Sequence, residues 1–243
     1  MRISIVQSNY LPWKGYFDLI ASSDLFVVYD SAQFTKNDWR NRNRIMTREG
    51  PVWLSLPIAT AGRSGQSIRD AQLADTRRLH RHALTLDQTY GKLPGYQEIR
   101  APLMAAFEQL GSCERLHDIN VTLLGCLARC LGLASEFIQD SDVPRESVNP
   151  TQRLVDICTY LGATSYLTGP AGLSYLELER FTRRGIAVDV IEYDHYSEYP
   201  QRGFAPFMHG VSVVDLIANT SVSAARRELR GRTHRAIRNQ TLE

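Results

Sequence analysis

The sequence predicts an α/β fold built on a doubly wound, mostly parallel β-sheet, with a helical insertion and a projecting β-hairpin. Two short, continuously apolar runs at 3–6 and 24–29 flank a helical pattern over 16–22. Such runs are typical of parallel strands, because helices cover both faces of these strands. A second strand, helix and strand follow one another between residues 164 and 193, around the turn sequence GPAG. Repeated units of this kind predict one doubly wound sheet.

Residues 39–47 alternate with a period of two, and a turn signal at 49–51 separates them from the apolar residues 52–58. This pattern predicts a β-hairpin near the strand ends. One of its faces would carry Arg40, Arg42 and Arg44. Guanidinium groups bind phosphate and carboxylate through paired hydrogen bonds, so anion binding is one interpretation. An edge strand protected from aggregation by its charges is the other.

Helical periodicity from 76 to 132 is interrupted near Gly91, Pro94 and residues 111–112, which predicts three helices that cap the sheet. We therefore expect three parts: an N-terminal βαβ unit with the basic hairpin at 1–75, the helical insertion at 76–134, and a C-terminal half that completes the sheet at 135–243. The arginine-rich residues 223–238 are expected to form a solvated helix face or a partly disordered end.

The composition is that of a globular protein with its own core, since the 243 residues are 43% hydrophobic and 22% charged. A net charge of +2 gives no reason to expect nucleic-acid binding. No run reaches the roughly 18 apolar residues of a membrane span, and no signal peptide precedes the first strand. We therefore expect a cytoplasmic protein without a membrane partner.

The four cysteines, Cys113, Cys126, Cys130 and Cys158, form no CxxC pair and lie in apolar helical surroundings. Reduced, buried thiols are the expected state. Cys126 and Cys130 lie one helical turn apart, but no second ligand pair is spaced to complete a metal site. We expect neither a metal nor a cofactor.

Polar and aromatic side chains follow both of the first two predicted strands. Ligands of open parallel sheets bind outside the carboxyl ends of the strands, so these side chains are candidates for contacts with a small polar substrate. The candidates are Gln7, Asn9, Tyr10 and Trp13 after the first strand, and Asp30, Gln33, Lys36, Trp39, Asn41, Arg42 and Asn43 after the second. Tyr199 and Gln201 join them from a polar, aromatic segment at 194–207. Ordinary turns with solvated charges are the alternative interpretation.

Several segments together resemble the WbqC-like family over nearly the whole chain. They are QSNYLPWKGYFDLIASSDLFVVYDSAQFTKNDWRNRNRI, RHALTLDQTYGK, YLTGPAGLSYLE and HGVSVVDLIAN. Members of that family are often associated with bacterial polysaccharide and natural-product gene clusters. The resemblance therefore implies a biosynthetic setting more firmly than a particular reaction.

The first strand, loop and helix also look like the start of nucleotidyl-transferring and pantothenate-synthetase-like enzymes. Those enzymes use an HxGH element to hold ATP phosphates at a helix N-terminus. Trp13 and Tyr16 stand in place of the two histidines here. This likeness implies a nucleotidyltransferase-like, Rossmann-like fold, and it keeps ATP-dependent adenylation or nucleotidyl transfer open as an alternative function.

The family setting and the candidate residues together predict a small-molecule transferase that joins an acyl or aminoacyl group to an amine of a sugar or natural-product intermediate. His82, Asp30 and Lys36 are the predicted catalytic residues. His82 or Asp30 would take the amine proton. Lys36, with Asn41 and Asn43, would polarise a carbonyl oxygen. Since no cysteine is placed for a covalent acyl intermediate, we expect direct transfer.

The identity of the base stays open among His82, Asp30 and His195. Arg42 and Trp39 would hold a phosphate and a ring of a small-molecule substrate, with nucleotide-linked and carrier-linked forms both open. A homodimer is also open. The alternative from another class is a non-catalytic ligand-binding subunit of a biosynthetic assembly.

Overall fold

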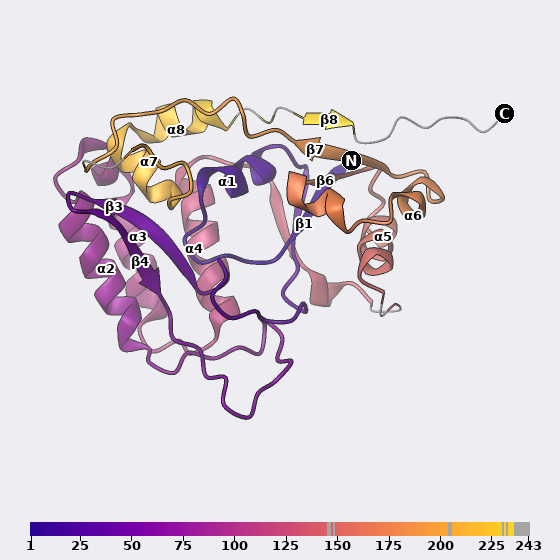
Figure 1. Cartoon of the computed structure of the whole chain (residues 1–243), viewed down its shortest axis with the longest axis horizontal. Coiled ribbons are helices and arrows are strands. Elements are labelled where there is room, and N and C mark those ends of the chain that lie inside the picture. Colours follow the sequence, from indigo (N-terminus) through magenta and orange to yellow (C-terminus); the bar gives the residue numbers. More distant parts are fainter. Residues whose placement is uncertain (145–146, 148, 204–205, 230, 232, 236–243) are drawn as a thin grey trace.

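The computed structural model describes residues 1–144, 147, 149–203, 206–229, 231 and 233–235. Within these residues, the main sheet has six strands in the order β5-β2-β1-β6-β7-β8 (Figure 1). The strands are β1 (Arg2–Val6), β2 (Leu25–Val28), β5 (Glu136–Gln139), β6 (Ser165–Thr168), β7 (Ala187–Ile191) and β8 (Thr233–Arg235). The first five in this order are parallel, and β8 runs antiparallel along β7. The predicted doubly wound, mostly parallel sheet is therefore confirmed.

Helices cover both faces of the sheet. They are α1 (Lys14–Ala21), α2 (Arg77–Tyr90), α3 (Pro94–Leu110), α4 (Leu116–Cys130), α5 (Pro150–Tyr160), α6 (Leu178–Thr182), α7 (Val213–Asn219) and α8 (Val222–Glu228), with short 3-10 turns η1 (Asp140–Asp142) and η2 (Pro170–Ser174). Alternate residues of each strand pack on opposite faces. In β2, Phe26 packs in the cluster that contains α1, whereas Val27 packs in the cluster that contains α5 and α6.

The predicted β-hairpin and the three predicted helices are both present. The hairpin consists of β3 (Arg42–Thr47) and β4 (Gly50–Ser55), and it lies with α2, α3, α4, α7 and α8 at one end of the molecule (Figure 1). The division into three parts stays a prediction. One hydrophobic cluster contains residues from each part, for example Phe17, Leu103 and Val214.

The last quarter of the chain is more broken than the sequence pattern indicates. In place of one helix after β6, the chain forms η2 and then α6, and the Glu177 backbone N–H between them donates to Thr151 Oγ1 (3.4 Å). The arginine-rich tail begins as α8, where Arg226 and Arg227 are exposed as expected of a solvated helix face. Residues 230, 232 and 236–243 of this tail lie outside the described residues.

Two further findings concern the cysteines and the membrane. All four thiols are free, with Cys126 and Cys158 buried and Cys113 and Cys130 only half-buried. Among the described helices, none is long and apolar enough to cross a membrane.

The close approach of α3 and α7 depends on Gly95, and this leads to a stability prediction. A Cβ atom at Gly95 would lie 2.0 Å from the backbone oxygen of Ile217. We therefore expect Gly95→Ala to lower the free energy of unfolding by about 1–3 kcal/mol, the usual cost of overpacking. Urea denaturation measures the change.

Gly125→Ala is the matched control, because Gly125 is also helical and the nearest atom to its added Cβ is the mobile Nη1 of Arg129, at 3.3 Å. It should be neutral or stabilising by up to about 1 kcal/mol, since alanine favours helix. Equal stability changes in the two variants would contradict the proposed packing at Gly95.

Candidate functional site

The strand order creates a natural binding crevice. β2 and β5 lie on one side of β1, and β6 and β7 lie on the other, so the chain reverses its winding direction between β1 and β6. Ligands of open α/β sheets bind outside the carboxyl ends of the strands at such a reversal. A cavity of about 550 Å³ lies there, lined by residues after β1, β2 and β6, including Gln7, Gln33 and Gly169.

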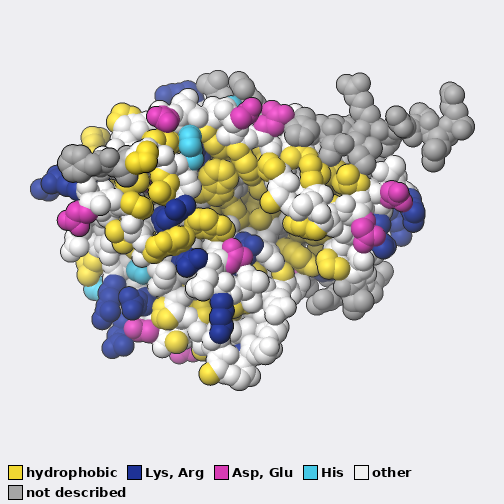
Figure 2. Space-filling model, in the orientation of Figure 1, with side chains coloured by type: hydrophobic (Ala, Val, Ile, Leu, Met, Phe, Trp, Pro, Cys, Tyr) yellow, Lys and Arg dark blue, Asp and Glu magenta, His cyan; other side chains and the backbone are white. Residues whose placement is uncertain are grey.

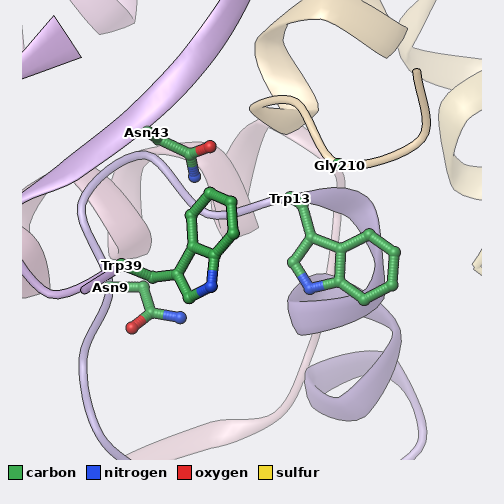
Figure 3. A pocket seen from close by; sticks show the side chains of 5 residues that line it. All are labelled: Asn9, Trp13, Trp39, Asn43 and Gly210. Atoms are coloured by element: carbon green, nitrogen blue, oxygen red, sulfur yellow. The ribbon is translucent and has the colours of Figure 1, made fainter. Parts of the chain in front are cut away.

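A second cavity of about 300 Å³ adjoins the first. Its lining residues Asn9, Trp13 and Trp39 also line the larger cavity, and Asn43 and Gly210 complete it (Figure 3). We call the two adjoining cavities the switch-point cleft. In the space-filling view, hydrophobic side chains surround a hollow near the middle of this face, and Lys and Arg side chains lie beside it (Figure 2).

The indole of Trp13 forms one wall of the cleft and covers the first turn of α1. Its ring centroid lies 4.9 Å from that of Tyr193, in an edge-on arrangement. A Cβ atom at residue 15 would lie 2.2 Å from the indole, so only glycine allows Trp13 to rest on the helix here. Tyr16, in the next position, donates its hydroxyl hydrogen to the Gln7 carbonyl oxygen (3.0 Å) and so closes the loop after β1.

Arg40 is the only charged side chain among the described residues that line the cleft. Its guanidinium donates to Asn9 Oδ1 and lies 3.7 Å from Asp38 Oδ2. Its Nε atom is buried and has no hydrogen-bond partner among the described residues. With the side-chain amides of Gln7, Asn9 and Gln33, this guanidinium gives the aromatic cleft a few oriented donors, which is the composition of a small-molecule site.

The turn after Asn9 is strained and is held by groups from three elements. Leu11 has a φ of 44°, which is unfavourable for a residue with a branched side chain. Asn43 on β3 donates its Nδ2 hydrogen to the Leu11 carbonyl oxygen (2.8 Å), and the Tyr10 backbone N–H donates to the Trp39 carbonyl oxygen (3.0 Å). The Tyr10 hydroxyl is hydrogen-bonded to His82 Nδ1 on α2 (2.9 Å). Asn43 therefore lines the cleft and also fixes the backbone of the opposite loop.

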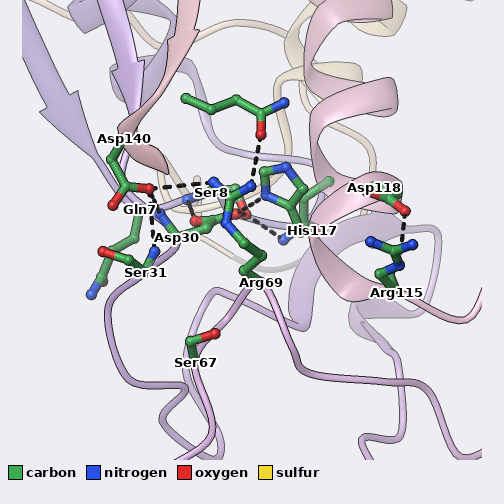
Figure 4. Close-up of polar contacts among 12 residues, drawn as sticks. Gln7, Ser8, Asp30, Ser31, Ser67, Arg69, Arg115, His117, Asp118 and Asp140 are labelled. Atoms are coloured by element: carbon green, nitrogen blue, oxygen red, sulfur yellow. Dashed lines mark hydrogen bonds and ion pairs between the residues drawn. The ribbon is translucent and has the colours of Figure 1, made fainter. Parts of the chain in front are cut away.

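A buried polar network joins the ends of β1 and β2 to α4. Val6 pairs with Val28 in the sheet, so Ser8 and Asp30 each stand two residues beyond a paired position and meet. The fully buried Asp30 carboxylate accepts hydrogen bonds from the Ser8 backbone N–H (2.8 Å) and hydroxyl (2.7 Å), and its Oδ2 lies 2.7 Å from His117 Nδ1 (Figure 4). Asn120 donates to the Ser8 hydroxyl (3.0 Å).

Asp140 adds a second layer to this network. Its Oδ1 accepts from the backbone N–H groups of Asp30 (3.1 Å) and Ser31 (3.3 Å), and it pairs with Arg69 (3.4 Å; Figure 4). The loop after β2 is thereby tied to the end of β5. Donors therefore surround the Asp30 carboxylate and Asp140 Oδ1, as burial of charge requires. Asp140 Oδ2 is buried and has no hydrogen-bond partner among the described residues.

The predicted catalytic residues lie around the cleft without lining it. Asp30 is enclosed in the network above, and Lys36 is exposed. His82 is buried behind Tyr10, and its desolvation, with a smaller contribution from Arg78, lowers its pKa to about 4. His195 is also buried, with Nε2 3.4 Å from Asp18 Oδ2. The catalytic assignments of these residues stay predictions.

The structure divides the predicted substrate-binding residues into two groups. Those that line the cleft are Gln7, Asn9, Trp13, Gln33, Trp39 and Asn43. Those that bond elsewhere are Tyr10, Asn41, Arg42, Tyr199 and Gln201. Asn41 donates to the Leu56 carbonyl oxygen (2.7 Å), and Arg42 donates to the Asn37 carbonyl oxygen.

Tyr199 and Gln201 bind a buried carboxylate. Asp215 is fully buried in the first turn of α7 and accepts from the hydroxyls of Tyr90 (2.6 Å) and Tyr199 (2.7 Å) and from Gln201 Nε2 (2.7 Å). Burial raises the pKa of Asp215, although these donors oppose the shift. The segment after β7 is thus fastened to α2 and α7.

His117 and Asn120 belong to the polar network and were missed from the sequence. His117 and Asn120 lie three residues apart on the buried face of α4, among apolar residues such as Leu116 and Leu123, and polar residues at these core positions were the available signal. Lys14 is 2% exposed, with Nζ 4.5 Å from the ring centroid of Tyr196. Desolvation lowers the pKa of Lys14 to about 8, while Glu228 acts in the opposite direction.

The lowered pKa of His82 predicts a pH dependence of stability. Unfolded His82 binds a proton below about pH 6.5, whereas the folded residue does so only near pH 4. The unfolded state therefore binds more protons between these values, and stability should fall as the pH drops, by at most about 1.4 kcal/mol per pH unit for this group.

Urea midpoints measured between pH 4.5 and 7 for the wild type and His82→Gln test this expectation. The difference between the two curves isolates His82, because the other buried acids titrate in both proteins. Parallel curves over this range would show that His82 is not the group responsible.

Comparison with known proteins places the chain in a family. The model of the WbqC-like protein family matches residues 7–227. The chain is 36% identical over 225 residues to Uncharacterized protein Rv1507c of Mycobacterium tuberculosis (strain ATCC 25618 / H37Rv), which covers 92% of this chain and 95% of that protein. No solved structure matches the chain significantly. The chain belongs to the WbqC-like protein family.

Proposed function

We propose that this protein is a small-molecule transferase that joins an acyl or aminoacyl group to an amine of a sugar or natural-product intermediate in the switch-point cleft. The observation that supports this most is the cleft itself. Two indoles and several side-chain amides surround a space of about 550 Å³ at the reversal point of the sheet. This volume lies within the roughly 300–1,000 Å³ of small-molecule sites.

The chemistry of the lining suits direct transfer. The amine nitrogen attacks the acyl carbon, and the bond from that carbon to the thioester sulfur breaks. The sulfur leaves with the bonding electron pair and takes up the amine proton, so the products are an amide and a free thiol. Negative charge develops on the acyl oxygen, and Arg40 and Asn9 are the donors we propose to stabilise it. Trp13 and Trp39 hold the two substrates next to each other, so their correct orientation contributes to the rate enhancement.

His82 and Asp30 support this site from behind the lining. His82 holds Tyr10, next to Asn9, and Asp30 holds Ser8. In the proposal they position the loop after β1, and the acceptor amine enters in its neutral form. Lys36 is exposed, and in the proposal its ammonium group interacts with the substrate; Lys36→Ala, which should then lower kcat/KM, tests this role.

Arg40→Ala and Trp13→Ala test the transferase proposal. With acyl thioesters as donors and amino sugars as acceptors, Arg40→Ala should lower kcat by about 10²-fold, as expected when one donor to the oxyanion is lost. Trp13→Ala should mainly raise KM, since it removes binding surface. Steady-state kinetics separates the two effects.

Arg77→Ala is the control for Arg40, because the Arg77 side chain is 79% exposed and, within the described part of the chain, pairs only with Asp75 on the surface. Lys92→Ala is the control for Lys36→Ala, since both lysines are exposed. An unchanged kcat in Arg40→Ala together with an unchanged KM in Trp13→Ala would remove the cleft from the reaction.

A non-catalytic ligand-binding subunit is the second candidate. It is favoured by one observation: the described lining of the cleft holds no carboxylate, imidazole or ammonium group. This candidate predicts that amino sugars or acyl donors bind in the cleft with no product formed under any donor and acceptor pair.

The ATP-dependent alternative has less support from the geometry. The first turn of α1, where related folds hold phosphates, is covered by the Trp13 indole, and Lys14 is turned toward Tyr196. Release of pyrophosphate from ATP in the presence of the acceptor would revive this alternative.

A further inference from the structure

We infer that one face of the hairpin formed by β3 and β4 binds a nucleoside diphosphate, and that the acceptor for transfer is therefore a nucleotide-linked amino sugar. The inference rests on the proposed function for the sugar and its amine. The nucleotide surface itself is argued from the hairpin alone.

Three side chains of this hairpin and Trp39, just before it, alternate between rings and cations. Trp39, Arg44, Trp53 and Arg42 form a continuous row, which we call the Trp-Arg ladder. The Arg44 guanidinium lies 5.6 Å from the Trp39 ring centroid and 5.1 Å from that of Trp53, and the Arg42 guanidinium lies 4.4 Å from Trp53. The register explains the row, because Arg44 and Trp53 are direct cross-strand partners.

The rings of the ladder are open to a ligand. Trp39 is 38% exposed and Trp53 is 43% exposed, although large aromatic side chains normally find a buried place. Trp39 also lines both cavities of the switch-point cleft. The ladder and the cleft are therefore one continuous surface, and a molecule too long for the cleft can extend over the hairpin.

No described carboxylate lies within ion-pair distance of the two cations of the ladder. Neither Arg42 nor Arg44 forms an ion pair with a described acidic residue, and each donates instead to a backbone oxygen, Arg44 to that of Gly210 (3.1 Å). The Nε atom of Arg44 is buried and unpartnered in the described structure, as is that of Arg40 in the cleft. The nearby Asp38 accepts hydrogen bonds from Thr35 Oγ1 (2.8 Å) and from the Trp39 backbone N–H (2.7 Å), and it interacts with Arg40 and Arg42 through charge alone.

These features fit a nucleoside diphosphate. Guanidinium groups bind phosphate oxygens in pairs of hydrogen bonds. The two arginines of the ladder, two residues apart on β3, offer one such group to each of the two phosphates. An exposed indole accepts any nucleobase by stacking, and stacking needs no base-specific hydrogen bonds. The sugar on the far phosphate would then enter the cleft past Trp39. A longer nucleic acid is less suitable, because the ladder offers only two rings and two cations.

The tryptophans provide a direct readout of binding. All three tryptophans of the chain, Trp13, Trp39 and Trp53, belong to the cleft or the ladder. Quenching of intrinsic fluorescence by UDP and ADP therefore measures binding at this surface. We expect both nucleotides to bind, and uridine or inorganic pyrophosphate alone to bind at least tenfold more weakly.

Trp53→Ala and the double variant Arg42→Ala/Arg44→Ala should each raise the Kd for UDP at least tenfold, measured by calorimetry so that the loss of an indole does not distort the signal. Trp53→Phe should restore much of the affinity, since it keeps a ring. Arg77→Ala serves as the charge control and should bind UDP normally. Circular dichroism confirms that each variant folds.

The enzymatic arm uses an N-acetylcysteamine thioester as donor, since this donor carries no nucleotide. The wild type should use a UDP-linked amino sugar with a KM at least tenfold below that of the free amino sugar, and Trp53→Ala should abolish this difference. The inference is overturned if the wild type does not bind UDP. It is also overturned if Trp53→Ala and Arg42→Ala/Arg44→Ala bind UDP as tightly as the wild type does. Either result counts even if free amino sugars are acylated.

A protein that binds nucleotides but transfers no acyl group would separate the nucleotide-binding inference from the proposed transferase function. Nucleotide binding that depends on the ladder, without acyl transfer to any acceptor, would leave the nucleotide surface in place and reject the transferase. The ladder could instead bind an acidic carrier protein, with binding lost in the same variants and not competed by UDP. That result would overturn the inference that the ladder binds a nucleoside diphosphate.

Discussion

The site depends on one buried carboxylate. Asp30 receives hydrogen bonds from the backbone and side chain of Ser8 and lies against His117, so it fastens the ends of two neighbouring strands to α4. A charge buried this deeply is tolerated only when donors surround it. The parallel register supplies the first of these donors, because Ser8 and Asp30 stand at matching positions beyond β1 and β2. Both loops that line the cleft start from this point.

Two tyrosines outside the cleft lining, Tyr196 and Tyr199, are fastened by two further carboxylates. Asp18 on α1 accepts the Tyr196 hydroxyl (2.8 Å), and Asp215 on α7 accepts the Tyr199 hydroxyl (2.7 Å). Burial raises the pKa of both acids against the effect of these hydrogen bonds. The tyrosine rings are thus anchored at their polar ends. Their faces remain available to Trp13 and Lys14.

The sequence was sufficient for the fold class and for most of the loops that form the cleft. Continuous apolar runs identify β1 and β2, and the polar residues directly after them, such as Gln7 and Gln33, do line the cleft. Pattern alone could not place Tyr199 and Gln201, because their partner Asp215 lies on another element and binds both. His117 stands 87 residues from Asp30, and only the tertiary structure brings them together. Local periodicity carries no information about such contacts.

The contact between Trp13 and Gly15 links the identities of two positions in the chain. No side chain fits at residue 15 while the indole occupies its present place. A lineage that replaced this glycine would first need a smaller residue at position 13. That smaller residue would uncover the backbone N–H groups that begin α1. Loss of the contact between Trp13 and Gly15 would therefore expose the N-terminus of α1. The exposed N–H groups could then bind an anion, as helix N-termini in related folds do.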